Sequence, residues 1–285
     1  MDGPKIVART LSDLMDPDKK YGNRWQYNPR SDRHSKIACW AILFDLMRHC
    51  RTLAQHIEAG SVGFGINHEM RDFKTGRKKD LDLVICTPGT PGSSTKKLTT
   101  FSKLGAKYDV RLTDAQREEL EQLPTFEETP VGEVHLALEA KACMTAHSKA
   151  RPRLYDELSS SHLTIHGSSN FAIAAGFVMV NVSDQFISPT SNPFSVAERS
   201  PEYNAHKQPK DTEGVIEKVR EIQRRSGTAE TGFDAIGLVV VSCVNDGTPV
   251  EVVTVPPAPT PGDLLHYDAM IRKIANLYQS RFPHR

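Results

Sequence analysis

The sequence lacks the patterns that identify several common classes of protein. No two of its five cysteines form a Cys-x-x-Cys pair, and their odd number argues against a disulfide framework or a zinc ribbon. Buried free thiols in a reducing cytosol are the better interpretation. The cysteines are Cys39, Cys50, Cys86, Cys143 and Cys243.

Long apolar runs are also missing. No segment approaches the roughly 20 apolar residues that span a bilayer, and the start MDGPKIVART has no basic stretch followed by an apolar one. Hydrophobic residues make up 38% of the chain, which is enough to build a core. We therefore expect a globular, cytoplasmic protein without membrane contact.

Charge of one sign does not dominate the composition. The chain has 36 lysines and arginines against 35 aspartates and glutamates, for a net charge of +1. Composition thus neither indicates nor excludes a nucleic-acid partner, and any basic binding surface would have to be local.

Familiar catalytic signatures are absent too. The sequence contains no GxxxxGK[ST] phosphate loop, no HExxH zinc helix and no GxSxG nucleophile turn. His162 and His166 have the spacing of a zinc helix, but Gly167 suggests that the helix has already ended. Cys143 and His147 lack a supporting nucleophile signature, so we do not favour zinc or acyl-transfer chemistry.

Hydrophobic periodicity predicts an α/β protein in which helices cover a mixed sheet. Residues 1–35 are polar and aperiodic and are predicted to form an N-terminal arm. Residues 36–285 are predicted to form one domain, with a core at about 36–182, an insertion at about 87–132 that opens with a loop, and an α/β extension at 183–285. The predicted helices span 36–59, 113–123, 148–162, 211–225 and 263–282, and the predicted strands span 61–73, 80–86, 134–147, 171–182 and 236–244.

Two of these strands carry charges inside apolar sequence, which is costly unless the charges are paired or bind an ion. Side chains alternate across a strand, so Glu139 and Lys141 share one face with His135, opposite Leu136 and Leu138. In DLDLVIC, the same alternation places Asp80, Asp82 and Val84 opposite Leu81, Leu83 and Ile85. If the two strands are neighbours, Asp82 and Glu139 converge and Lys141 lies one step along.

Converging carboxylates repel each other, and a divalent cation relieves the repulsion. Mg²⁺ prefers oxygen ligands, takes one or two protein carboxylates and keeps bound waters. Such a site activates water and neutralises charge on a phosphate, and a neighbouring lysine can orient the water, deprotonate it or stabilise the phosphate oxygens. The pattern therefore indicates phosphodiester hydrolysis.

Asp82 in KKDLDLVIC followed by Glu139-Ala140-Lys141 in LALEAK resembles the PD-(D/E)xK nuclease superfamily. The resemblance covers residues 36–182 and implies a restriction-endonuclease-like α-β-β-β-α-β core, with a long insertion between the second and third strands. It also implies that Asp82, Glu139 and the Ala140 carbonyl bind Mg²⁺, with Mn²⁺ as a substitute, and that Lys141 is the catalytic lysine.

The chain departs from the family pattern in two places. Leu81 stands where the motif often has proline, and the insertion at 87–132 separates the two halves of the motif. Asp80 is a rival to Asp82 as the metal ligand, although Asp82 lies nearer the middle of its strand. Glu69 and Asp45 are further candidates for a second metal.

The leading hypothesis is a metal-dependent DNA endonuclease that resembles type II restriction enzymes of restriction–modification systems or nucleases of antiviral (phage) defence. It would act on double-stranded DNA as a homodimer, and Lys149, Arg151 and Arg153 would face the phosphate backbone. A non-catalytic binding or assembly protein with a nuclease-like fold is one alternative, and a repair or RNA nuclease of the same superfamily is another. There is also a structural alternative without a site. In it, Glu139 and Lys141 form a simple pair on an exposed strand face, and Asp82 is solvated.

Overall fold

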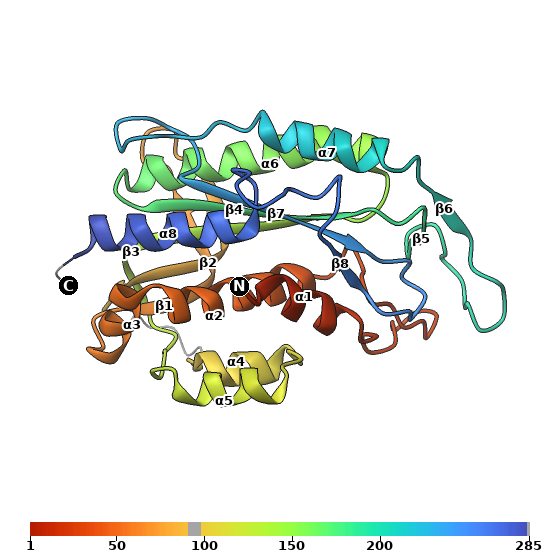
Figure 1. Ribbon diagram of the computed structural model, residues 1–285, viewed down its shortest axis with the longest axis horizontal. Coiled ribbons are helices and arrows are strands. Elements are labelled where there is room, and N and C mark those ends of the chain that lie inside the picture. Colours follow the sequence, from red (N-terminus) through yellow and green to blue (C-terminus); the bar gives the residue numbers. More distant parts are fainter. Residues whose placement is uncertain (91–97, 284–285) are drawn as a thin grey trace.

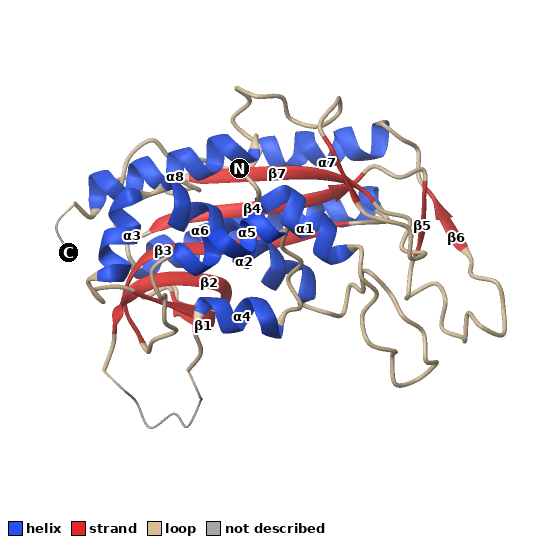
Figure 2. Cartoon of the chain, turned by 60° about the horizontal axis from the view of Figure 1, so that its bottom comes forward, coloured by secondary structure: helices blue, strands red, loops and turns tan. Residues whose placement is uncertain are grey.

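The computed structural model describes residues 1–90 and 98–283 and has a six-stranded mixed sheet at its centre. The strand order is β1-β2-β3-β4-β7-β8, in which β3, β4 and β7 are parallel and the other neighbours antiparallel (Figure 2). The strands are β1 (Gly63–Arg71), β2 (Lys78–Pro88), β3 (Val131–Cys143), β4 (Ile173–Asn181), β7 (Ala235–Ser242) and β8 (Glu251–Val253). A separate pair consists of β5 (Gln185–Ile187) and β6 (Tyr203–Ala205).

Helices cover both faces of the sheet because its central strands are apolar on both sides. On β4, Phe177 and Met179 face one helical layer, whereas Val178 and Val180 face the other. The first layer contains α1 (Gly3–Leu11), α2 (Arg33–His49), α3 (Arg51–Glu58) and α8 (Tyr267–Arg281). The second contains α6 (His147–Ser168) and α7 (Lys210–Arg220), seen above the sheet in Figure 1.

The prediction of an α/β protein with a mixed sheet flanked by helices is thus confirmed. The predicted helix at 36–59 divides at Cys50, whose extended backbone (ψ 89°) separates α2 from α3. Four short elements, α4 (Phe101–Lys107), β5, β6 and β8, were not predicted.

The N-terminal segment differs from the predicted arm. Residues 3–11 form α1, whose Ile6, Val7 and Leu11 are buried in the core. The start of α1 is held by Asp45, which accepts hydrogen bonds from the backbone of residues 2 and 3 at 3.0 and 2.8 Å and from the Tyr267 hydroxyl at 3.0 Å. Asp45 therefore ties α1 and α8 to α2, which gives it a structural role in place of the second metal ligand that we considered.

The described residues of the insertion at 87–132 pack against α2, and β2 and β3 on either side of it are paired. Its far end returns to β1, where the Phe64 N–H donates to Glu127 O and the Phe64 carbonyl accepts from Thr129 N, both at 3.0 Å. Phe101 of α4 stacks on Trp40 with ring centroids 4.6 Å apart. The predicted helix appears as α5 (Asp114–Gln122), with a capping box between Thr113 and Gln116, whereas residues 91–97 of the predicted loop lie outside the described residues.

None of the helices within residues 1–90 and 98–283 is long and apolar enough to cross a bilayer.

Candidate active site

The two halves of the proposed motif meet where β2 and β3 run side by side. The strands are antiparallel, and their regular pairing begins at Leu83 and Leu138. One step further, the Ala140 N–H donates to Asp82 Oδ2 at 2.8 Å. The side chain of Asp82 therefore binds the strand that carries Glu139 and Lys141, as the sequence predicts.

The strand phase around Asp82 is less regular than expected. Leu83 and Ile85 pack on the α2 and α8 side, but Leu81 packs with the α6 and α7 cluster. On β1, Asn67 has a left-handed backbone (φ 50°) between the positions paired with Leu81 and Leu83. This irregularity turns β2 over at Asp82, so the prediction that Leu81 shares a face with Leu83 is wrong.

A second irregularity removes His135 from the predicted face. The pairing shifts from Ile85–Leu136 to Cys86–Val134, which leaves His135 as the extra residue of a bulge. Its ring stacks on Phe282 beyond α8, with centroids 4.2 Å apart. His135 therefore belongs to the α8 side of the sheet and not to the candidate site.

Glu139 is the most buried acid of the site, with 2% of its surface exposed. Its Oε1 lies 2.7 Å from Lys141 Nζ and 3.6 Å from Lys79 Nζ. Its Oε2 is buried and has no hydrogen-bond partner among the described residues. Burial and the nearby Asp82 carboxylate raise the pKa of Glu139, whereas Lys141 and Lys79 act in the opposite direction.

Burial and neighbouring charges also shift the pKa values of Asp82 and Lys141. Burial raises the pKa of Asp82, although the Ala140 N–H acts in the opposite direction. Burial alone would lower the pKa of Lys141, but the Glu139 carboxylate outweighs it and raises this pKa. Lys141 therefore remains protonated at neutral pH.

Sequence reasoning missed two residues of the site, Lys79 and Glu157. Glu157 on α6 lies 3.2 Å from Lys141 Nζ, and its backbone carbonyl accepts from Lys79 Nζ at 2.6 Å. Regular alternation would place Lys79 on the opposite face from Asp82, but β2 turns over between them. Glu157 lies on the helix that follows the motif. Its ion pair with Arg153, at 2.6 Å, has the four-residue spacing of one helical turn, and this spacing was its only signal in the sequence.

A pocket of about 300 Å³ opens beside Lys141. Tyr27, His34, Arg153 and Glu157 are among its lining residues. Burial and the neighbouring Lys141 lower the pKa of His34 to about 4, so the imidazole is neutral at pH 7. The pocket gives an extended ligand access to the amine of Lys141.

The site residues fit a hard divalent cation with few protein ligands. Within residues 1–90 and 98–283, no group of three or more His, Cys, Asp or Glu side chains is arranged to hold a metal. Mg²⁺ needs only one or two carboxylates besides waters, and Asp82 and Glu139 supply two. In an extended strand the N–H and C=O of one residue point the same way, so the Ala140 carbonyl is directed to the edge where Asp82 lies. Glu139 Oε2, which has no hydrogen-bond partner among the described residues, is an oxygen that could bind the cation.

The rival acids lie elsewhere. Asp80 is exposed and stands opposite Glu69 on β1. Glu69 pairs with Lys78 at 2.7 Å on the exposed surface. Neither has a described contact with Glu139 or Lys141, so Asp82 is the acid that the fold brings to the motif.

The histidine and thiol alternatives also lack the geometry they need. His166 Nε2 bonds the Gly232 carbonyl at 2.8 Å, whereas His162 packs edge-on against Phe233. Cys143 is buried, and burial raises its pKa to about 12, which disfavours a thiolate nucleophile.

Comparison with known proteins gives no match: no family model, no curated protein and no solved structure is similar to this chain. The proposal that follows therefore depends on the site itself.

Proposed function

We propose that the protein is a metal-dependent DNA endonuclease with a restriction-endonuclease-like core. One observation carries the proposal: the Ala140 N–H to Asp82 hydrogen bond joins the two halves of the motif. Lys141 lies 2.7 Å from Glu139, whose second oxygen has no hydrogen-bond partner in the described part of the chain. The order α2-β1-β2-β3-α6-β4 supports it, because it follows the α-β-β-β-α-β order that the resemblance implies, with α3, α4 and α5 as additions.

Each site residue has a distinct task in this mechanism. Asp82, Glu139 and the Ala140 carbonyl would hold Mg²⁺ or Mn²⁺, which supplies a more acidic water and neutralises charge on the scissile phosphate. Lys141, held protonated, donates to the phosphate oxygens as negative charge accumulates on them. Glu157 and Lys79 position the Lys141 amine and limit its rotation.

Double-stranded DNA is the substrate we propose. Lys149 and Arg153 are exposed on the first turns of α6, directly after the motif strand. Phosphate contacts from such residues would orient the duplex, while sequence would be read by the surrounding loops. A homodimer would cut both strands of a palindromic site.

The test compares Asp82→Asn with Asp80→Asn, two isosteric changes on the same strand. Plasmid cleavage with Mg²⁺ or Mn²⁺ should fall at least about a hundredfold in Asp82→Asn and in Lys141→Ala. Asp80→Asn should cleave like the wild type, and EDTA should abolish all activity. Equal cleavage by both aspartate variants would reject the site, and cleavage of RNA but not DNA would reject the proposed substrate.

One observation favours a non-catalytic alternative. Lys141 and Lys79 already compensate the charge of Glu139 in the absence of a metal, as they would in a binding or assembly protein of the same fold. Calorimetric titration with Mn²⁺ separates the two functions: binding that is lost in Asp82→Asn supports the nuclease, and no binding supports the alternative.

A further inference from the structure

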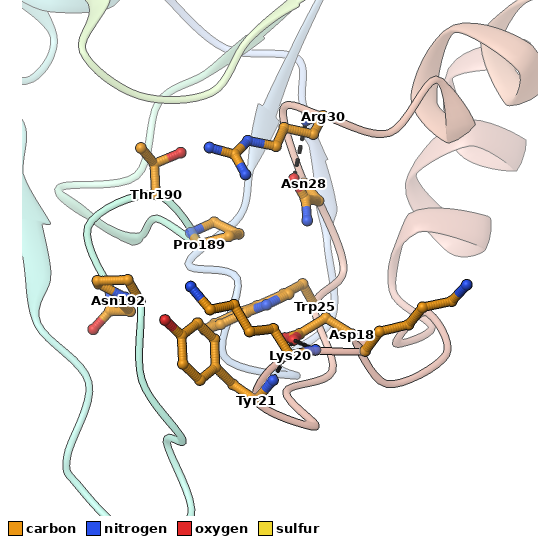
Figure 3. A pocket seen from close by; sticks show the side chains of 11 residues that line it. Asp18, Lys20, Tyr21, Trp25, Asn28, Arg30, Pro189, Thr190 and Asn192 are labelled. Atoms are coloured by element: carbon orange, nitrogen blue, oxygen red, sulfur yellow. Dashed lines mark hydrogen bonds between the residues drawn. The ribbon is translucent and has the colours of Figure 1, made fainter.

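A second pocket, of about 350 Å³, lies between residues 18–30 and 189–193. The segment 25–30 separates it from the pocket beside Lys141, because Tyr27 and Pro29 line that pocket, whereas Trp25, Asn28 and Arg30 line this one. None of the candidate site residues contributes to it (Figure 3).

Hydrogen bonds within the protein hold the walls of this pocket in place, without a bound ligand. Asn23 crosslinks them, since its Nδ2 donates to Phe194 O at 2.7 Å and its Oδ1 accepts from Val196 N at 2.9 Å. Asn192 is anchored by three hydrogen bonds to Ser188 and Glu202. The pocket is therefore preformed, which reduces the entropic cost of binding.

Two aromatic residues line the pocket, Trp25, which is 5% exposed, and the half-buried Tyr21. Lys20 Nζ lies 4.9 Å from the centre of the Tyr21 ring, which keeps a cation next to this apolar surface.

The rim of the pocket is cationic. Lys20 and Arg30 are exposed, and neither has an ion-pair partner among the described residues. In Figure 3 both side chains extend from the 18–30 segment towards Pro189 and Thr190. The one acid in the lining, Asp18, already accepts hydrogen bonds from the backbone amides of residues 20, 21 and 23. With Lys19, the lining has three cations against this one acid, so an anion entering the pocket meets a net positive charge.

We propose that this pocket binds a nucleotide, with its base against Tyr21 and Trp25 and its phosphate on Lys20 and Arg30. Aromatic stacking holds bases of any sequence, and an arginine guanidinium matches the geometry of a phosphate. The Tyr21 and Thr190 hydroxyls are polar groups within reach of a base edge. The volume is within the range of small-molecule sites.

The nucleotide has two chemical sources, a free nucleotide or one residue of a DNA strand turned out of its stack. The proposal does not depend on the nuclease proposal, because binding is measured without metal and without cleavage. The experiments can therefore reject the proposed nuclease site and the proposed nucleotide pocket independently of each other.

The test is calorimetric titration in EDTA with dAMP, with inorganic phosphate and with a short single-stranded deoxyadenosine oligonucleotide. The wild type is compared with Lys20→Ala/Arg30→Ala and with Arg272→Ala/Lys273→Ala. The second pair removes two exposed cations from α8, an element that contributes nothing to the pocket. Tryptophan fluorescence gives an independent signal, because Trp40 is buried against Phe101 and only Trp25 would report a bound base.

The expected result is quenching of Trp25 and binding that weakens at least about tenfold in the pocket variant but not in the α8 variant. Binding of dAMP identifies a free nucleotide as a sufficient ligand, and binding of the oligonucleotide alone identifies a DNA strand; both support the site. No binding of either probe, equal losses in the two double variants, or phosphate binding as tight as that of dAMP would overturn it. Thermal unfolding of each variant verifies that a loss does not come from misfolding.

Discussion

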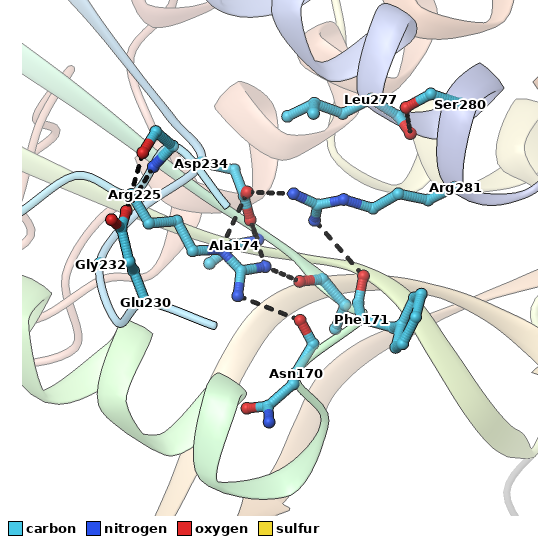
Figure 4. Close-up of polar contacts among 12 residues, drawn as sticks. Asn170, Phe171, Ala174, Arg225, Glu230, Gly232, Asp234, Leu277, Ser280 and Arg281 are labelled. Atoms are coloured by element: carbon cyan, nitrogen blue, oxygen red, sulfur yellow. Dashed lines mark hydrogen bonds and ion pairs between the residues drawn. The ribbon is translucent and has the colours of Figure 1, made fainter. Parts of the chain in front are cut away.

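Two clusters of buried acids and cations in this protein have opposite electrostatic character. Around Asp234, Arg225 bonds both carboxylate oxygens at 2.9 and 2.8 Å, Arg281 bonds Oδ1 at 2.6 Å, and the Ala174 N–H donates to Oδ2 at 2.8 Å (Figure 4). Around Glu139, one oxygen meets two lysines and the other has no partner in the described part of the chain.

The pKa shifts follow this difference. Burial alone would raise the pKa of Asp234, but Arg225 and Arg281 outweigh it and lower the pKa. In the candidate site, burial raises the pKa of both Asp82 and Glu139, and the Asp82 carboxylate raises that of Glu139 further. The Asp234 cluster is satisfied by protein groups and stabilises the fold, whereas in the Glu139 cluster one carboxylate oxygen has no partner among the described residues and can accept a ligand.

The largest effect is expected for Asp234→Ala. Removing this acid leaves Arg225, whose side chain is completely buried, without its counter-charge, which should cost about 3–5 kcal/mol of unfolding free energy. Urea unfolding followed by circular dichroism measures it, with the exposed Asp156→Ala on α6 as the control. A loss no larger than that of the control would show that the cluster contributes little.

A smaller loss is expected for Lys141→Met in metal-free protein. The substitution removes the nearest cation from Glu139, but Lys79 and partial solvent access remain, so about 1–2 kcal/mol should be lost at pH 7. Adding Glu139→Gln should restore most of the stability, because the uncompensated charge is then absent. Additive losses in the double variant would contradict the described ion pair.

The two clusters should respond to pH with opposite signs. The lowered pKa of Asp234 means that its stabilisation is complete above its ordinary value of 3.8 and is lost as pH falls through the lowered value. The raised pKa of Glu139 means that stabilisation by its proton is complete below 4.5 and is lost as pH rises through the raised value.

The test measures unfolding free energy in EDTA from pH 3 to 8. It compares the wild type with Asp234→Asn and with Glu139→Gln. The difference between the wild type and Asp234→Asn should grow with pH, and that between the wild type and Glu139→Gln should shrink. Each unit of pKa shift corresponds to about 1.4 kcal/mol, and slopes of the same sign for both variants would contradict the contrast.

The smallest change in stability is expected for Glu139→Gln at pH 7, within about 1 kcal/mol and of either sign, because a buried charge with an unpartnered oxygen is replaced by a neutral amide. Under the proposed function, the same variant should lose DNA cleavage. Loss of stability as large as that of Asp234→Ala would mean that Glu139 is a structural acid.

The sequence predicted those parts of the site that depend on local pattern. Alternation in LALEAK placed Glu139 and Lys141 correctly on one face, and Asp82 reaches their strand as expected. Lys79 and Glu157 could not be predicted, because their places depend on a left-handed residue in β1 and on the packing of α6. The bulge at His135 depends on a shift in the pairing of β2 with β3, which the sequence pattern does not show.

The same limit applies to the fold. Helix α1 has only nine residues in a polar context, so its burial depends on partners that are distant in sequence, namely α2, β8 and α8. Strand β8 has three residues, fewer than a reliable alternation requires.

The attachment of Asp45 to both α1 and Tyr267 also has a consequence for the order in which the chain folds. Tyr267 follows Asp45 by 222 residues, and Asn245 holds the backbone of Gln26 and Tyr27 across a similar separation. During synthesis, these contacts of the first helical layer cannot form until residues 245–267 have been made. Such distant contacts slow folding and prolong the exposure of apolar surface, so we expect this layer to be completed late in folding.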